Sequence, residues 1–101
     1  MTDREILELA ARAMLYDDAQ WDHERQCIST AKLTGSRRLW NPITDDGDAL
    51  RLAVKMNITV HPGFVYTPTG RLIDYRDYAN RIGATRLAIV RAAAEMGRNM
   101  P

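Results

Sequence analysis

The sequence predicts an α+β fold in which three helices pack against a mainly antiparallel sheet of three to five strands. Two observations lead to this class. Apolar residues recur at helical spacing in three stretches, and between them lie short β-branched or aromatic segments bounded by turn residues. A length of 101 residues, with 46% hydrophobic and 27% charged residues, suits one core, so we expect residues 1–101 to form one domain.

The first helix is predicted from its N-terminal cap. Thr2–Glu5 match the capping box, in which a threonine hydroxyl accepts from the amide three residues on and a glutamate returns to the threonine amide. Helical spacing follows at once, so we expect a helix from Asp3 to about Leu15. Its apolar face is formed by Ile6, Leu7, Ala10, Ala13 and Met14.

The segment from Tyr16 to Trp40 loses the helical period. It begins as a polar connection that is anchored by Trp21. Residues 26–30 and 37–40 have the composition of two short strands, and the turn-forming residues 33–36 lie between them. We therefore expect a hairpin in this segment.

The second helix is predicted to start after Asn41-Pro42. Proline fixes the backbone there, and the side chain of Thr44 or Asp45 can accept a hydrogen bond from an amide two or three residues on. We expect the helix to run from Thr44 to Met56, with Asn57 as its stop. Its predicted inner face holds Ala49, Leu52, Ala53 and Met56, and its outer face holds Asp48, Arg51 and Lys55.

Three more strands are predicted after this helix. Ile58–Val60 and Phe64–Tyr66 are rich in β-branched and aromatic residues. Arg71–Tyr75 returns after the turn Thr67–Gly70, which contains proline and glycine. We expect these strands to pair in antiparallel fashion.

The third helix is expected from about Ala84 to Met96. Its apolar stripe holds Leu87, Val90, Ala93 and Ala94. Gly97 is predicted as the C-terminal stop, because glycine tolerates the left-handed backbone that ends many helices. Residues 97–101 are expected to form a frayed tail.

Two of these stretches, Trp40–Lys55 and Ala84–Ala93, resemble a family of small phage and prophage proteins described as a phage α-β-α (ABA) sandwich domain. The resemblance spans most of the chain and is weakest over Asp17–Leu39. It implies a three-layer α-β-α sandwich, with helices on both faces of the sheet, and a location in the cytoplasm of a host cell. The family has no established activity, so no functional residue is carried over.

Asp45, Asp46 and Asp48 form an acidic cluster at the predicted start of the second helix. The helix dipole stabilises each exposed carboxylate there by roughly 0.3–1 kcal/mol. Carboxylates also bind magnesium and calcium, but a calcium-binding loop ends in glutamate at its twelfth position, which counted from Asp45 is Met56. We favour capping and keep a metal-dependent function at this helix start as a third functional hypothesis.

No pattern in the sequence indicates catalysis. Cys27, Ser29 and Ser36 lie in no motif of an activated nucleophile, and the scattered glycines form no phosphate-binding loop. His23 and Cys27 are four residues apart, but a zinc site needs three or four ligands and His61 is the other histidine. We predict that the protein is not an enzyme and needs no cofactor or metal ion.

Composition also predicts the compartment. A lone cysteine suits a reducing environment, and neither a secretory signal nor an apolar run of about 20 residues is present, so we expect a cytoplasmic protein without membrane contact. Residues 1–50 carry 6 basic and 10 acidic groups (−4), whereas residues 51–101 carry 8 basic and 3 acidic groups (+5). We interpret this asymmetry as mutual neutralisation of the two halves.

These exclusions leave macromolecule binding as the predicted function. Tryptophan, tyrosine and arginine dominate binding hot spots, and on that basis we nominate Trp21, Arg37, Arg38, Tyr75, Arg76, Tyr78 and Arg81. The expected partner is a host or phage protein, and inhibition of a host defence system is one such role. A core position for Trp21 and Trp40 is the competing interpretation, which we favour from their size.

Nucleic-acid binding is the alternative function. Arginines recur through the second half, at Arg71, Arg76, Arg81, Arg86, Arg91 and Arg98, and Tyr66, Tyr75 and Tyr78 offer stacking surfaces. The net charge of +1 argues against it, because proteins that bind a phosphate backbone usually carry a clear basic surplus.

Overall fold

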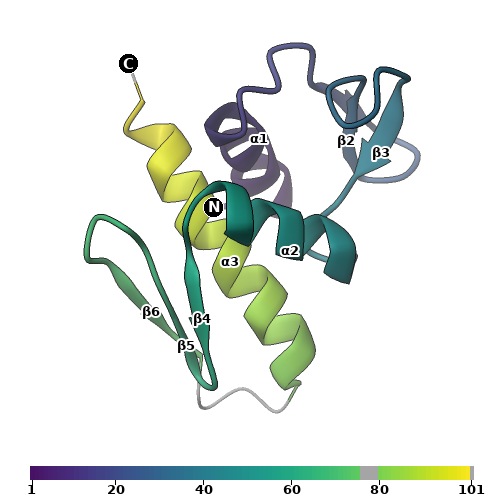
Figure 1. Ribbon diagram of the computed structural model, residues 1–101. Helices are drawn as coiled ribbons and strands as arrows, with labels where there is room; N and C mark the ends of the chain where they lie inside the picture. The colour runs from purple at the N-terminus through teal and green to yellow at the C-terminus, as the bar shows by residue number, and fades with distance from the viewer. Residues whose placement is uncertain (76–79, 101) are drawn as a thin grey trace.

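The computed structural model describes residues 1–75 and 80–100 (Figure 1). Two nominated residues, Arg76 and Tyr78, lie outside this range. The α+β class with three helices is confirmed. In chain order the elements are α1 (Asp3–Ala13), β1 (Gln20–Asp22), β2 (Cys27–Thr30), β3 (Arg38–Trp40), α2 (Asp46–Lys55), β4 (Thr59–His61), β5 (Phe64–Tyr66), β6 (Leu72–Asp74) and α3 (Arg81–Arg98).

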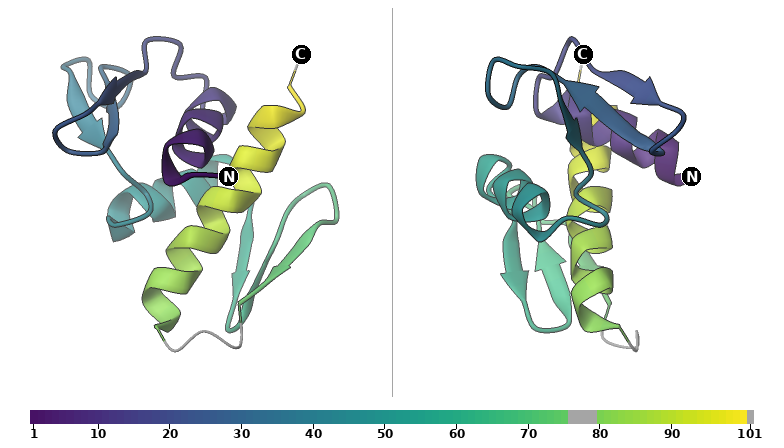
Figure 2. Two further views of the ribbon diagram at one scale, coloured as in Figure 1. Left: turned by 180° about the vertical axis from the view of Figure 1, so that it is seen from behind. Right: turned by 90° about the vertical axis from the view of Figure 1, so that its right-hand side faces the viewer.

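The strands of the described chain form two sheets of three instead of one. Their orders are β1-β2-β3 and β4-β5-β6, and all neighbouring strands are antiparallel. Both predicted hairpins are present. The first gains the unpredicted strand β1, in which Trp21 pairs with Ile28. Figures 1 and 2 place the two sheets at opposite ends of the molecule, with α2 between them along the chain.

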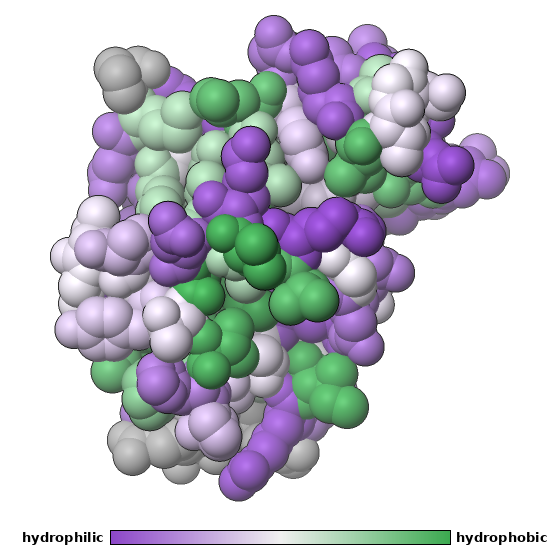
Figure 3. Space-filling view, in the orientation of Figure 1, coloured by the Kyte–Doolittle hydropathy of each residue, from purple (hydrophilic) through white to green (hydrophobic). Residues whose placement is uncertain are grey.

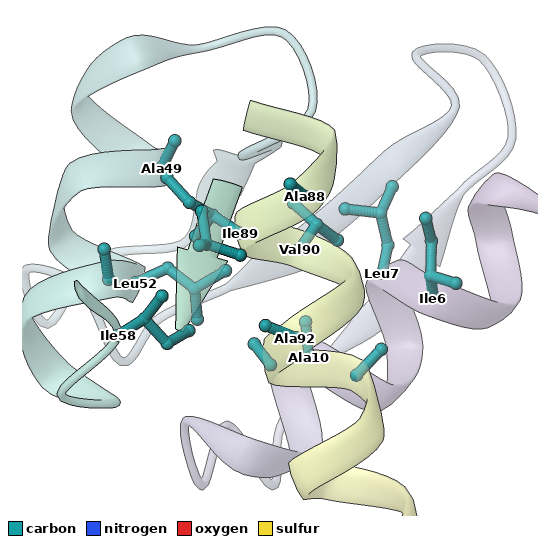
Figure 4. Packing of buried hydrophobic residues seen from close by; sticks show 14 of the residues in the cluster. Ile6, Leu7, Ala10, Ala49, Leu52, Ile58, Ala88, Ile89, Val90 and Ala92 are labelled. Carbon is teal, nitrogen blue, oxygen red and sulfur yellow. The ribbon is translucent and has the colours of Figure 1, made fainter. Parts of the chain in front are cut away.

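Helix α3 organises the core between these sheets. It packs along α1 and also contacts α2, β5 and β6, while α1 contacts β2. The layering therefore differs from that of a sandwich built around one sheet, because the first sheet packs on α1 and the second on α3. Figure 4 shows the core around α3, with Leu7 of α1 and Leu52 of α2 approaching it from different sides.

Large buried side chains from several elements fill this core. Trp40 is fully buried, as the core interpretation predicted, and the Tyr16 ring meets it edge-on at a centroid distance of 5.4 Å. Full burial of a valine or leucine contributes about 1.5–3 kcal/mol. The fully buried set also includes Leu7, Ile28, Leu52, Val65 and Val90.

The interface between α1 and α3 depends on small residues. Ala10 and Ala13 of α1 and Ala93 of α3 are buried, and Ala13 lies beside Gly97 of α3. At Gly97 the backbones come so close that a Cβ atom would lie 2.0 Å from the carbonyl oxygen of Leu9. The prediction that Gly97 stops the helix is wrong: α3 continues to Arg98, because glycine serves here for close packing and not for a left-handed turn.

Local hydrogen bonds define the helix starts. The predicted capping box of α1 is confirmed, since the Glu5 amide donates to Thr2 Oγ1 at 3.2 Å and the Thr2 amide donates to Glu5 Oε1 at 3.2 Å. The Thr2 amide and the Thr2 hydroxyl both donate to the Glu5 carboxylate and thereby lower its pKa. Helix α3 begins before the predicted Ala84, because Asn80 caps it by accepting from the Gly83 amide at 3.1 Å.

The stop of α2 also follows the prediction. Asn57 has a left-handed backbone, with φ of 54°, directly after the last turn of α2. Asparagine is one of the residues that adopts this conformation most readily. In the parts of the chain that the structure describes, no helix is both long enough and apolar enough to cross a bilayer.

Candidate functional site

The acidic cluster at the start of α2 is held by protein contacts. Asp45 is the N-cap and accepts from the Asp48 amide at 2.8 Å, which confirms the capping interpretation. Asp46 accepts from Nη1 of Arg86 on α3 at 2.6 Å. The Arg86 Nε also donates to the Ile43 carbonyl at 2.8 Å, so this arginine ties α3 to the segment before α2.

Asp48 departs from its predicted place on the outer face of α2. It is buried, and its carboxylate accepts from the Asn41 amide at 2.9 Å and from Arg51 Nη2 at 2.7 Å. The prediction was wrong because the chain entering α2 folds back over this side of the helix. The Asp48 carboxylate also raises the pKa of Arg51 by accepting its hydrogen bond.

The contacts of these aspartates give little support to metal binding. Asp45 and Asp48 line a polar cleft of about 450 Å³, but Arg38 and Arg51 line the same cleft and balance their charge. A nearby guanidinium opposes the binding of a cation. Within residues 1–75 and 80–100, no three His, Cys, Asp or Glu side chains are gathered to hold a metal ion.

Of the nominated residues in and beside the first sheet, Trp21 and Arg37 contact other parts of the protein. Trp21 is half-buried on β1, and the Arg4 guanidinium lies 5.3 Å from the centre of its ring. Arg37 donates to the carbonyls of Ser29 at 2.9 Å and Asp18 at 3.3 Å, so it braces the loop before β3. Arg38 is exposed and reaches the polar cleft beside α2.

The remaining described nominees, Tyr75 and Arg81, belong to the other end of the chain. Tyr75 is buried, and its hydroxyl donates to the His61 carbonyl at 2.7 Å, so it holds the second sheet together. Arg81 is exposed at the first turn of α3. The structure therefore does not bring the five described nominees, Trp21, Arg37, Arg38, Tyr75 and Arg81, into one surface.

Cys27 packs as a small apolar residue. It is buried on β2 opposite Asp22, and this burial raises the pKa of its thiol. His23 is exposed in the turn between β1 and β2. Residues 20–30 form a hairpin and not a helix. His23 and Cys27 therefore do not lie on one helical face, as half of a zinc site would require.

An apolar groove, missed by the sequence-based nominations, lies between α2, β4 and α3. It has a volume of about 370 Å³, with Ala49, Leu50, Val60, Ile82 and Ile89 among its lining residues. Leu50, Val60 and Ile82 are 64%, 45% and 65% exposed, and Val54 follows Leu50 by one helical turn and is 70% exposed. Figure 3 shows apolar side chains gathered on this face.

A pattern in the sequence could have revealed this groove. Leu50 and Val54 are four residues apart and lie on the same side of α2, yet neither belongs to the buried set around Leu52. A helix with a second apolar stripe beside its core stripe either has another neighbour or leaves that stripe in water. Only the fold shows that the stripe is left open.

A second cleft lies on another side of α3, and we call it the arginine cleft. It has a volume of about 570 Å³ between the start of α1, β6 and the last turns of α3. Arg71, Arg91 and Arg98 line it together with Glu95. These three arginines belong to the series that recurs through the second half of the sequence. Arg86, another member of that series, lines the apolar groove and is bound to Asp46.

Comparisons with known proteins do not identify the chain. No protein-family model matches it, and no curated protein or solved structure is significantly similar to it. The resemblance to phage sandwich proteins therefore stays a prediction from the sequence.

Proposed function

We propose that this protein acts by binding another protein, and that the apolar groove between α2, β4 and α3 is the contact surface. One observation carries the proposal: Leu50, Val60 and Ile82 come from three elements and expose large apolar side chains around a single groove. Single exposed apolar residues are normal, but a contiguous group of them marks an interaction surface.

The groove also suggests the chemistry of the partner segment. It lies between two helices, and such grooves accept the apolar face of an amphipathic helix, whose side chains recur at every third or fourth position. Asp46 and Arg86 form an ion pair at its edge and supply the polar rim that surrounds most interface cores. The partner is expected to bury Leu50 and Ile82 as its central contacts.

The wider role that we propose is that of a phage or prophage accessory protein in the cytoplasm of a host cell. Such a protein occupies a surface of a host or phage protein, and blunting a host defence is one outcome. This part of the proposal is supported by the sequence resemblance and by the lack of a catalytic motif. Binding of this kind needs no catalytic residues, so we propose no enzymatic activity.

The test compares two matched variants. Tagged wild-type protein, Leu50→Glu and Leu39→Glu are used to recover partners from a host lysate, and the affinity of each recovered partner is then measured by calorimetry. Leu39 is also exposed, at 43%, but it lies on β3 away from the groove. Loss of a central contact typically costs about 2 kcal/mol or more, so Leu50→Glu is expected to weaken binding about 30-fold or more.

Two results would contradict the proposal. In the first, Leu50→Glu and Leu39→Glu recover the same partners with equal affinity. In the second, light scattering shows that the wild-type protein is a dimer that Leu50→Glu dissociates, which would make a second copy of the chain the occupant.

Nucleic-acid binding remains the alternative function. The described arginines of the second half do not form one track, because Arg86 is bound to Asp46 and Ile43 on one side of α3 while Arg91 and Arg98 face the other. Titration with mixed-sequence DNA at two salt concentrations tests it, since binding to a phosphate backbone must weaken steeply with salt.

A further inference from the structure

The arginine cleft combines positive charge with an apolar floor. Arg91, Glu95 and Arg98 are spaced by four and three residues, so they form one row along α3. Arg71 approaches this row from the second sheet, and its Nε lies 3.4 Å from Glu95 Oε2.

The charges of the cleft are not balanced internally. One glutamate faces three arginines, and this glutamate already contacts Arg71. Arg91 and Arg98 are exposed, and neither has a hydrogen bond or ion pair with any described residue. Two guanidinium groups on one helical face are thus available to an anion. Guanidinium groups bind phosphate oxygens in a bidentate manner, with more directional donors than an ammonium group has.

The rest of the lining indicates what is attached to the anion. Half-buried Ile73 of β6 lines the same cleft, and the buried side chains of Ile6 of α1 and Ala94 of α3 lie at its floor. Its volume of about 570 Å³ lies within the range of small-molecule sites, which is roughly 300–1,000 Å³. An oligonucleotide would extend beyond it, whereas a single phosphate ester with one flat or apolar group would fit.

We propose that the arginine cleft binds a small phosphate monoester whose organic part is aromatic or apolar. Arg91 and Arg98 hold the phosphate, and the organic part lies over Ile6 and Ile73. A nucleoside monophosphate and an alkyl phosphate share this chemistry. The site is separate from the apolar groove: at about 100° per residue, Arg91 and Arg98 lie on the opposite side of α3 from Ile82 and Ile89.

Calorimetric titration at low salt tests this site with defined probes. Adenosine monophosphate and hexyl phosphate represent the two sources of the ester, and adenosine and inorganic phosphate each lack one half of the ligand. We expect at least one ester to bind more tightly than both halves. Arg91→Gln and Arg98→Gln are each expected to weaken its binding about tenfold, because each removes a charge-assisted contact.

Arg25→Gln is the matched control, since Arg25 is exposed in the turn before β2. It is expected to change the affinity by less than about twofold, because exposed charges far from a ligand are screened. Circular dichroism confirms that each variant is folded. The preferred ester, aromatic or alkyl, then identifies the source of the ligand.

Four outcomes would overturn the proposal. They are the absence of binding by either ester, equal binding of adenosine and its monophosphate, equal binding of inorganic phosphate and the esters, and an affinity that Arg91→Gln and Arg98→Gln leave unchanged. A single-stranded oligonucleotide that binds far more tightly than the mononucleotide, with a steep salt dependence, would also overturn it and favour a nucleic-acid partner.

Discussion

The side of α3 that faces α1 is closed, whereas the side that faces α2 and β4 is open. On the closed side, Gly97 and Ala93 allow the two backbones to approach until a single added methyl group would meet the Leu9 carbonyl. On the open side, bulky Ile82 and Leu50 stand at the edges of a groove and remain largely exposed.

This difference separates residues that stabilise the fold from residues that are free for binding. Small side chains bring helices together and leave no space for a ligand, since protein interiors are packed as densely as organic crystals. Large apolar side chains that remain in water contribute little to folding, so their presence in a group requires another explanation.

The largest effect is expected from two leucines of the same helix. Leu52→Ala should lower the free energy of unfolding by about 2–5 kcal/mol, because Leu52 is fully buried and its truncation leaves a cavity. Leu50→Ala should change it by less than about 0.5 kcal/mol, because Leu50 is 64% exposed. Urea denaturation of both variants measures the difference. Equal costs would show that the groove is closed in solution.

Two glycines give the next test. Gly97→Ala is expected to cost about 1–3 kcal/mol, because the new methyl group would meet backbone of α1, which cannot rotate away. Gly47→Ala is the control: its Cβ would lie 3.2 Å from the Asp45 carboxylate, within a helix where alanine is favoured over glycine by up to about 1 kcal/mol. Thermal unfolding should rank the wild type above Gly97→Ala. A higher unfolding temperature for Gly97→Ala than for the wild type would show that α1 and α3 are not packed closely at Gly97.

A smaller, pH-dependent effect is expected where the loop before β1 is hydrogen-bonded to the end of β2. The Thr30 hydroxyl and the Ala31 amide donate to Asp18 and lower its pKa below the usual 3.8. A lowered pKa means that the Asp18 carboxylate stabilises the fold above that value, and that this stabilisation is lost as the pH falls through the folded-state pKa.

Asp18→Asn should therefore flatten the fall in stability below about pH 4, measured as unfolding midpoints from pH 2 to 7. Asp17→Asn is the control, because Asp17 is highly exposed and pairs with Lys32 across 3.3 Å. A wild-type pH profile for Asp18→Asn would show that Asp18 does not couple to folding. The closed and open sides of α3 should be unchanged in Asp18→Asn.

The sequence by itself determined the starts of α1 and, closely, of α2, and it determined most of the strands. The Thr2 capping box and the Asn57 stop were predicted, and Asp45 was one of the two caps considered for α2, because each of these features depends on hydrogen bonds or backbone angles within a few residues. The hairpin of β5 and β6 followed from the turn Thr67–Gly70 for the same reason, and the Gly70 amide does donate to the Thr67 carbonyl at 3.0 Å.

Tertiary structure alone decided the rest. It buried Asp48, it placed Gly97 inside an interface instead of at a helix end, it divided the strands between two sheets, and it left Leu50 exposed. None of the nominated binding residues that the structure describes lines the apolar groove, because composition indicates which residue types favour binding but not which of them remain exposed together. The physical reason is that burial depends on which elements meet, and those contacts join residues far apart in the chain.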